Sequence, residues 1–118
     1  MCGIAGIFSH TSTPIDCAAL LSMRDQMRDR GPDDVGEWVS PEGSVGFVHT
    51  RLAIMDLTIA GSQPMRSFDG RYLIVFNGEI YNYQELRKEL IAAGVNFRGN
   101  SDTEVILNLF AIHRERAC

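Results

Sequence analysis

The sequence has 118 residues, the size of one common domain, and 45% of them are hydrophobic while 22% are charged, as in ordinary globular proteins. Its 11 basic and 15 acidic side chains give a net charge of −4 without long runs of one sign, which argues against nucleic-acid partners and anionic membrane surfaces because both require clustered Lys and Arg. No segment is long and apolar enough to span a membrane, and the apolar N-terminus lacks the basic flank of a signal peptide.

The first expected elements are a strand and a helix. Residues 3–8 form an apolar run with two glycines, which predicts a buried strand that another backbone or a ligand can approach closely. Thr13 is a candidate helix N-cap, with Pro14 at the first helical position, and the helix should end at the Gly-Pro pair at 31–32. Three apolar residues at helical spacing should be buried: Leu20, Met23 and Met27.

A hairpin is expected next. Short strands are predicted at residues 35–39 and 45–49, joined by a turn at 40–43 that contains a proline and a glycine. Residues 50–64 should be irregular, with Arg51 directly after the second strand.

A further strand and two helices complete the expected elements. The β-favouring run at 71–76 predicts a strand that stops at Asn77-Gly78. Asn82 and Glu85 form a near capping box for a helix that ends at Gly94, and Ser101-x-x-Glu104 is a full capping box for another. The apolar residues of these helices are Leu86, Leu90, Ala93, Val105, Ile106, Leu109, Phe110 and Ile112. The pattern predicts an α+β protein with largely antiparallel strands.

Cys2 is the first candidate for chemistry, because a small second residue permits removal of Met1. The thiol and a free α-amine would then share one residue, and an α-amine with a pKa of roughly 8 can accept the thiol proton. On position alone, a small buried hydrophobe at the start of a strand is the commoner role of such a cysteine.

Asn77 and Gly78 offer a side-chain amide and a backbone N–H, the pair of donors that stabilises a tetrahedral oxyanion. Alone, Asn-Gly is more often a simple turn. Arg51 is flanked by apolar residues, and a partly buried arginine needs an anion such as an α-carboxylate. Asp102 and Glu79 could hold an ammonium group, although Asp102 is also explained as a favourable charge in a first helical turn.

Other polar residues receive no functional assignment. The segment Arg30-Gly31-Pro32-Asp33 is explained by a helix end followed by a turn. The histidines show no shared metal spacing, and the odd number of cysteines forms no metal-type pair, so we expect no metal site, no disulfide framework and a cytoplasmic location. The histidines are His10, His49 and His113, and the cysteines are Cys2, Cys17 and Cys118.

Five segments occur in an order that is more specific than any one of them: MCGIAGIF at the N-terminus, RGPD at 30–33, RLAIMDL at 51–57, FNGEIYNY at 76–83 and SDTEVI at 101–106. Together they resemble the class II glutamine amidotransferases, which belong to the N-terminal-nucleophile hydrolases. The branch that NGEIYNY and RLAIMDL resemble is the glutaminase domain of glutamine-hydrolysing asparagine synthetase.

The resemblance implies a four-layer α/β/β/α sandwich of mostly antiparallel sheets. It also implies that Cys2 is the nucleophile after removal of Met1, and that Asn77 and Gly78 form the oxyanion hole. Glutamine would be bound by a set of side chains and backbone groups: Arg51 at its α-carboxylate, Leu52, Ile54 and Met55 along the pocket, and Glu79 and Asp102 at its amino group.

The implied reaction releases ammonia from glutamine through a thioester on Cys2, with no cofactor in this domain. In the family, ammonia then reaches a synthetase domain or partner subunit that uses ATP and magnesium to activate aspartate. Residues 2–118 contain no sequence for such a domain.

The family domain continues beyond the equivalent of Ile112 with further strands. We therefore expect residues 2–118 to be the incomplete N-terminal part of the domain, whose missing strands would leave sheet edges exposed. Two alternatives remain at this point: an inactive fragment or interaction module, and an amidotransferase that supplies a different acceptor.

Overall fold

The computed structural model describes residues 1–114, which separate into two compact units. Unit 1 consists of Met1–Ala53, Ser62–Pro64 and Val75–Asn77, whereas unit 2 consists of Ile54–Gly61, Met65–Ile74 and the described residues from Gly78 onward. Both units combine helices with antiparallel strands, which confirms the α+β class. Cys118 lies outside the described residues, and within them no helix is long and apolar enough to cross a membrane.

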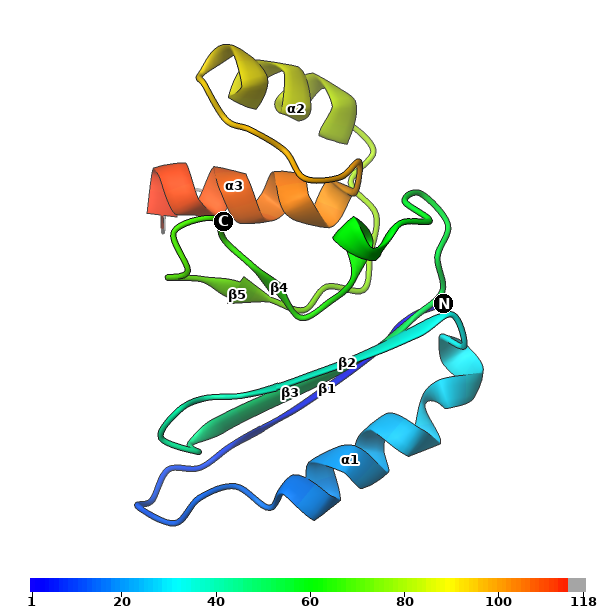
Figure 1. Cartoon of the computed structure of the whole chain (residues 1–118), viewed down its shortest axis with the longest axis vertical. Helices are drawn as coiled ribbons and strands as arrows, with labels where there is room; N and C mark the ends of the chain where they lie inside the picture. Colours follow the sequence, from blue (N-terminus) through cyan, green and yellow to red (C-terminus); the bar gives the residue numbers. More distant parts are fainter. Residues whose placement is uncertain (115–118) are drawn as a thin grey trace. The chain divides into compact units, whose positions relative to one another are not determined.

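Unit 1 is built on a three-stranded antiparallel sheet in the order β1-β3-β2 (Figure 1). Its strands are β1 (Gly3–Phe8), β2 (Asp34–Val39) and β3 (Val45–Arg51), which confirms the expected strand and hairpin. The turn between β2 and β3 contains Gly43 at a φ of 71°, a left-handed conformation that glycine adopts without steric cost. The second hairpin strand runs further than expected, so Arg51 is its last residue instead of following it.

Helix α1 (Cys17–Gln26) begins later than the sequence predicted. Its N-cap is Asp16, whose Oδ1 accepts hydrogen bonds from the N–H groups of Ala18 and Ala19 at 2.9 and 3.2 Å. A carboxylate that binds two of the orphan donors of the first turn is a better cap than Thr13. The chain then forms a short 3₁₀ helix, η1 (Arg28–Arg30), before the Gly-Pro pair.

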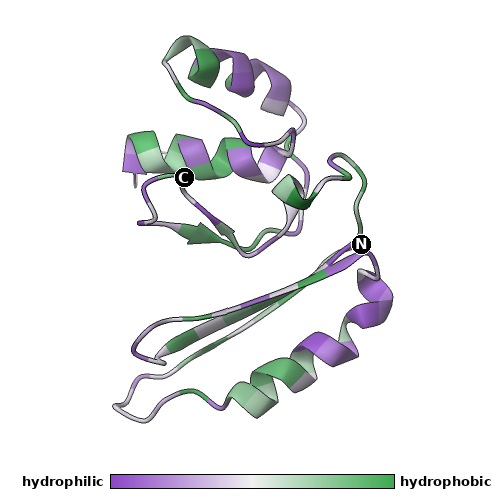
Figure 2. Cartoon of the chain, viewed as in Figure 1, coloured by the Kyte–Doolittle hydropathy of each residue, from purple (hydrophilic) through white to green (hydrophobic). Residues whose placement is uncertain are grey.

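One face of the unit 1 sheet packs against α1. The core cluster there is Ile15, Leu20 and Val48, with Ala5, Ile7 and Met27 partly buried around it. The prediction that Leu20 is buried is confirmed, whereas Met23 is 40% exposed and the prediction for it is wrong. Leu20 is the buried residue of α1, and Met23 follows it by less than one turn. Figure 2 shows apolar and polar residues mixed along this helix.

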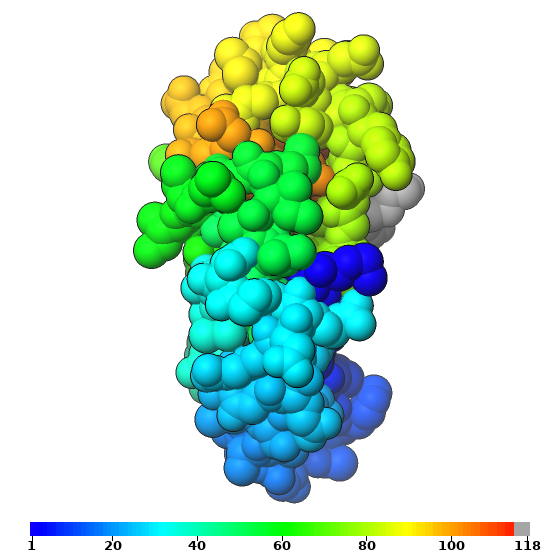
Figure 3. All heavy atoms as spheres, turned by 90° about the vertical axis from the view of Figure 1, so that its right-hand side faces the viewer, coloured from blue at the N-terminus to red at the C-terminus, as the bar shows by residue number. Residues whose placement is uncertain are grey.

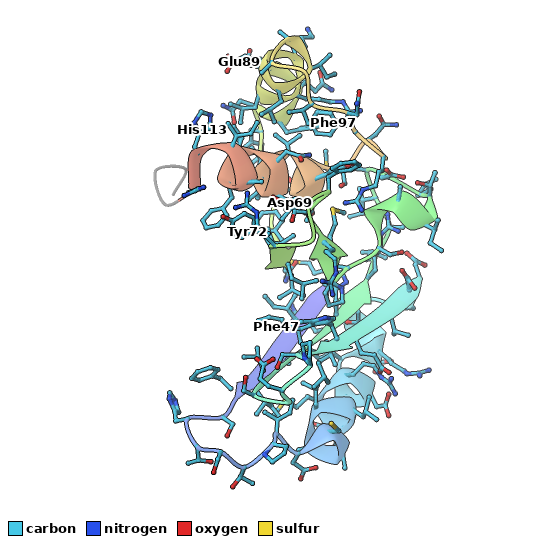
Figure 4. The ribbon with its side chains drawn as sticks, turned by 60° about the vertical axis from the view of Figure 1, so that its left-hand side comes forward. Phe47, Asp69, Tyr72, Glu89, Phe97 and His113 are labelled. Carbon is cyan, nitrogen blue, oxygen red and sulfur yellow. The ribbon has the colours of Figure 1, made fainter. Side chains whose placement is uncertain are left out.

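The opposite face of this sheet carries the alternate residues of β3, because successive side chains of a strand point to opposite faces. Phe47 lies on this face and stacks on Trp38, with ring centroids 6.1 Å apart (Figure 4). The segment Ser62–Pro64 of unit 1 covers part of it, since a Cβ on Gly36 would lie 1.7 Å from the Gln63 carbonyl oxygen. The peptide bond between Gln63 and Pro64 is cis.

Unit 2 contains two helices and a short two-stranded sheet (Figure 1). Its elements are η2 (Ile59–Gly61), β4 (Met65–Arg66), β5 (Leu73–Ile74), α2 (Tyr83–Ala92) and α3 (Asp102–His113). Tyr72 makes an edge-to-face contact with Phe110 of α3, and Arg87 of α2 lies over the Phe97 ring (Figure 4). The buried apolar residues of the unit are Met65, Leu90, Val105 and Leu107.

The strand expected at 71–76 is reduced to the two residues of β5. The first residues of the expected strand form a turn instead. The Asp69 carboxylate accepts hydrogen bonds from the Arg71 backbone N–H at 3.1 Å and from Nε of Arg71 at 2.6 Å. Its end belongs to unit 1, where the Phe76 N–H donates to Oε1 of Gln63 at 2.6 Å. Side-chain hydrogen bonds thus replace ladder bonds on both sides of β5.

The two helix starts of unit 2 differ in their capping. Ser101 caps α3, since its hydroxyl accepts the Glu104 N–H at 3.2 Å. Glu104 does not complete the expected box; its buried carboxylate accepts the N–H groups of Arg98 and Gly99 instead. Asn82 stands at the start of α2 but makes no capping hydrogen bond, so the near capping box is wrong there.

The ends of these helices match the sequence in part. Gly94 follows α2 with a φ of 93°, as a glycine stop requires. Leu90 and Val105 are buried as expected, but Ala93 and Ile112 are exposed because both lie at or near the last turn of their helix.

Candidate functional site

Cys2 lies at the start of β1, opposite the end of β3. The register pairs Gly3 with Thr50, so the residue before Gly3 reaches the chain just beyond β3. The Leu52 N–H donates to the Cys2 sulfur at 3.3 Å, and the thiol can donate to the Leu52 carbonyl at 3.7 Å. A backbone donor therefore faces the half-buried sulfur.

Two side chains hold the backbone of Cys2. The amide nitrogen of Asn77 donates to the Cys2 carbonyl at 3.0 Å, and Nε of Arg30 donates to the same oxygen at 3.4 Å. A side-chain amide carries two N–H donors, and the second one of Asn77 makes no hydrogen bond within the described residues. Asn77 thus lies beside the cysteine with one donor left over.

Met1 still precedes Cys2 in the described chain, so the Cys2 nitrogen is part of a peptide bond. Met1 is 73% exposed, and the dark-blue N-terminal atoms lie at the surface in Figure 3. Exposure leaves this first peptide bond accessible for removal of Met1.

Arg51 is the last residue of β3 and is only 8% exposed. It stands directly opposite Asp34 of β2 in the antiparallel register, a position in which opposite charges attract. Its carbonyl accepts the Asp33 N–H at 2.9 Å, and the Asp33 carboxylate accepts the Ala53 N–H at 2.8 Å. These bonds fix the backbone on both sides of Leu52, the residue that contacts the cysteine sulfur.

The segment Arg30-Gly31-Pro32-Asp33 therefore does more than end a helix. Arg30 and Asp33 bind Cys2 and Ala53, and a Cβ on Gly31 would lie 2.4 Å from the Thr50 carbonyl group. The sequence pattern predicted only a helix end and a turn here, and these contacts were not predicted. Two charged residues that flank a Gly-Pro pair were the available signal.

Five residues singled out in the sequence belong to unit 2: Ile54, Met55, Gly78, Glu79 and Asp102. Asp102 is 6% exposed at the first position of α3, and its carboxylate accepts the Ile80 N–H at 3.0 Å. That bond ties the backbone just after Glu79 to the N-terminus of α3. Glu79 and Gly78 are exposed, as are Ile54 and Met55.

Asp56 organises the loop that follows Met55, and the sequence analysis did not single it out. Its carboxylate is 5% exposed and accepts hydrogen bonds from the Thr58 N–H at 2.8 Å and the Asn100 N–H at 2.7 Å. The sequence does contain an indication of this role: Asp56 lies in an otherwise apolar stretch, and a carboxylate that becomes buried requires hydrogen-bond partners.

His49 lies two residues before Arg51 on the same face of the sheet and is 1% exposed. Among the described side chains, its two ring nitrogens are the buried polar atoms that make no hydrogen bond. Burial lowers the pKa of His49 below its ordinary value of 6.5, and the positive charge of Arg51 lowers it further, while the Phe76 backbone and Asp34 oppose this shift. The imidazole is therefore neutral at pH 7.

Unit 1 thus brings Cys2, Leu52 and Asn77 into direct contact and places Arg51 next to Leu52. In unit 2, Asp102 fixes the backbone beside Glu79. Within residues 1–114, no three His, Cys, Asp or Glu side chains are grouped so that they could hold a metal ion.

Known proteins match nearly the whole chain. The family described as "Glutamine amidotransferase domain" matches residues 1–116. An asparagine synthetase (glutamine-hydrolyzing) 1 of Bacillus subtilis is 42% identical over 120 residues, covering 99% of this chain and 18% of the relative. An asparagine synthetase (glutamine-hydrolyzing) 1 of Saccharomyces cerevisiae is 39% identical over 113 residues, covering 96% of this chain and 19% of the relative.

A relative with a different name is also similar. The protein named amidase chry2 of Gibberella zeae is 35% identical over 120 residues, covering 93% of this chain and 18% of the relative. The chain spans less than a fifth of the length of these relatives. The match over residues 1–116, together with the ordered segments that surround Cys2, means that this chain belongs to the glutamine amidotransferase domain family.

Proposed function

We propose that this chain is the glutaminase part of an asparagine synthetase-like enzyme, in which Cys2 hydrolyses glutamine to glutamate and ammonia. The observation that carries the proposal is the contact of the Cys2 sulfur with the Leu52 N–H, beside the Asn77 amide on the Cys2 carbonyl. Membership in the glutamine amidotransferase domain family supports the substrate class.

The reaction begins once Met1 is removed. The freed α-amine of Cys2 accepts the thiol proton, and the thiolate attacks the side-chain amide carbon of glutamine. The second N–H of Asn77 and the N–H of Gly78 stabilise the oxyanion that develops on the amide oxygen. The C–N bond then breaks, the leaving nitrogen takes the proton as ammonia, and water hydrolyses the thioester to glutamate.

Glutamine is held at its charged ends in this proposal. Arg51 binds the α-carboxylate as a bidentate donor, and Glu79 and Asp102 bind the amino group. The backbone and side chains of Leu52, Ile54 and Met55 line the pocket. Ile54 and Met55 are 68% and 41% exposed, so their side chains are accessible to a substrate.

The surrounding architecture belongs to the same proposal. Residues 2–118 would be one part of a four-layer α/β/β/α domain of the N-terminal-nucleophile hydrolase type, in a cytoplasmic enzyme. The glutaminase step uses no cofactor. A synthetase domain or partner subunit, with ATP and magnesium, would consume the ammonia, in keeping with the names and greater lengths of the relatives.

A second candidate keeps the glutaminase but changes the acceptor of the ammonia. The similarity to a protein named amidase chry2 supports it, because that name is not an asparagine synthetase. Adding aspartate or other candidate acceptors to the complete enzyme with ATP, and identifying the amidated product, separates the two candidates.

The test of the proposal is glutamate release from glutamine by the parent chain, Cys2→Ala and Cys17→Ala. Cys17 is a matched control because it is an exposed free thiol of the same unit. We expect the parent and Cys17→Ala to release glutamate at equal rates and Cys2→Ala to release none. Equal activity in Cys2→Ala and the parent would contradict the role of Cys2.

A further inference from the structure

His49 has a chemistry that the proposed reaction does not use. It is a potential donor and acceptor, yet it is 1% exposed and neither ring nitrogen makes a hydrogen bond. Burying an unpaired polar group is unfavourable, and an apolar residue of similar size at the centre of a sheet would avoid that cost. An unpaired group in such a position calls for an explanation.

The segment that lies near His49 carries the oxyanion donor. The Phe76 backbone is close enough to act on the imidazole, and Phe76 directly precedes Asn77. The Phe76 N–H is already bound to Gln63 at 2.6 Å, which leaves its carbonyl as the group that a ring N–H can reach. Asn77 in turn donates to the Cys2 carbonyl at 3.0 Å.

We propose that His49 is a positioning residue of the glutaminase: its neutral imidazole supports the Phe76 carbonyl and thereby sets the Asn77 amide beside Cys2. The inference rests on the proposed function, because it needs Asn77 to act as an oxyanion donor. Neither ring nitrogen makes a hydrogen bond in this structure, and the proposal requires that the bond to the Phe76 carbonyl form when glutamine binds. Hydrogen bonds of catalytic groups are often long without substrate and tighten in the complex.

The charge state of His49 determines whether its imidazole can take this role. The charged groups that act on it are Arg51, at the end of the same strand, and Asp34, opposite Arg51 on β2; Ser62–Pro64 and Val75–Asn77 of unit 1 bring no charge. Protonation would place a second positive charge near Arg51 in a buried site, which both burial and the charge of Arg51 disfavour. The neutral form is therefore the competent one.

The test uses His49→Leu and His49→Gln in the full chain, with the exposed His10→Gln as a matched control. Leucine keeps the volume and removes the donor, so the melting temperature should be unchanged or higher, while kcat for glutamine hydrolysis falls roughly 10-fold with little change in KM. Glutamine keeps an N–H donor and should recover most of the lost kcat. His10→Gln should match the parent.

The pH dependence separates positioning from mere packing. Glutamine does not titrate, whereas the pKa of His49 is lowered below 6.5 by burial, so the ratio of the kcat of His49→Gln to that of the parent should rise only as the pH falls below that value. A ratio that is constant with pH, or a parent-like kcat in His49→Leu, would overturn the inference while leaving the glutaminase in place. A parent chain with no glutamine hydrolysis would overturn the proposed function, and this inference with it.

Discussion

Asn77 makes a structural contact with Cys2 and, in the proposed function, also donates to the oxyanion. One amide N–H binds the Cys2 carbonyl at 3.0 Å, and the other is unused within the described residues. A residue that only terminates a strand has no need of a contact 75 positions away in sequence. The contact therefore favours the oxyanion role over the simple turn that the Asn-Gly pair alone would suggest.

Asn77→Ala should lower kcat for glutamine hydrolysis by about 100-fold to 1000-fold, the effect of removing one oxyanion donor. KM should change little, since the donor acts mainly in the transition state. Asn82→Ala is the matched control, because the exposed Asn82 side chain makes no capping bond. Steady-state assays of the three proteins check this, and a parent-like kcat in Asn77→Ala would remove Asn77 from the mechanism.

Asp69 gives a residue-level prediction about pH. The hydroxyl of Ser67, together with Arg71, lowers the pKa of Asp69 from 3.8 to about 2. Because the pKa in the folded state is below that of the unfolded chain, the stabilisation is complete above about pH 4 and is lost as the pH falls toward about 2.

Asp69→Asn should therefore unfold more easily than the parent near pH 6, and the difference should shrink at pH values of about 2 to 3. Urea unfolding at each pH measures it. Asp29→Asn is the control, because the Asp29 side chain is exposed and has no hydrogen bond with the described residues. A difference between parent and Asp69→Asn that is independent of pH would contradict the assigned pKa shift.

At the scale of the elements, helix starts could be predicted when the capping residue had no competitor. Ser101 was identified correctly, but Asp16 replaced Thr13 at α1, because a carboxylate binds two N–H groups there. The Glu104 carboxylate does not form the expected capping bond, because it accepts the N–H groups of Arg98 and Gly99. A local pattern cannot reveal that a loop six residues away competes for the same side chain.

Ser101→Ala should lower the free energy of unfolding by about 1 kcal/mol, the usual effect of losing an N-cap hydroxyl. Asn82→Ala should change it by less than about 0.5 kcal/mol, because no capping bond is lost. Urea unfolding of both variants gives the comparison. Equal losses would mean that the two caps do not differ as the hydrogen bonds indicate.

The coverage of β2 leads to another prediction at this scale. A Cβ on Gly36 would lie 1.7 Å from the Gln63 carbonyl oxygen, whereas a Cβ on Gly6 would meet the Phe47 ring at 2.9 Å. A backbone group yields less readily than a ring, so Gly36→Ala should be destabilising by about 3 kcal/mol or more and Gly6→Ala by less. Thermal unfolding ranks the two variants, and the reverse order would contradict the packing of Ser62–Pro64 on β2.

At the scale of the whole molecule, sequence order was more informative than spacing. The contact of Cys2 with Leu52 spans 50 positions and that with Asn77 spans 75, distances at which periodicity carries no information. The ordered segments nevertheless identified the family. Four of the five contain Cys2 or a residue that contacts it, and in the fifth Asp102 binds the Ile80 N–H. The support by Asp56 depends on a contact 44 positions away in sequence and was not predictable from composition.

The end of the expected strand at 71–76 also follows from long-range packing. Residues Val75–Asn77 join unit 1, while Leu73–Ile74 remain in unit 2. The strand predicted at 71–76 is therefore confirmed only for Leu73–Ile74, which pair with β4. Because the chain passes from unit 2 back to unit 1 at Val75, Asn77 lies in the same unit as Cys2 and binds its carbonyl.

The central claim is that Cys2, with a free α-amine, is a glutamine-directed nucleophile. Intact-mass measurement of the purified chain, before and after incubation with an electrophilic glutamine analogue, tests it most directly, with Cys17→Ala and Cys2→Ala treated in parallel. We predict a chain that lacks Met1 and gains one adduct, mapped to Cys2, in the parent and in Cys17→Ala but not in Cys2→Ala. A chain that retains Met1 and stays unmodified, or an adduct on Cys17 alone, would contradict the account.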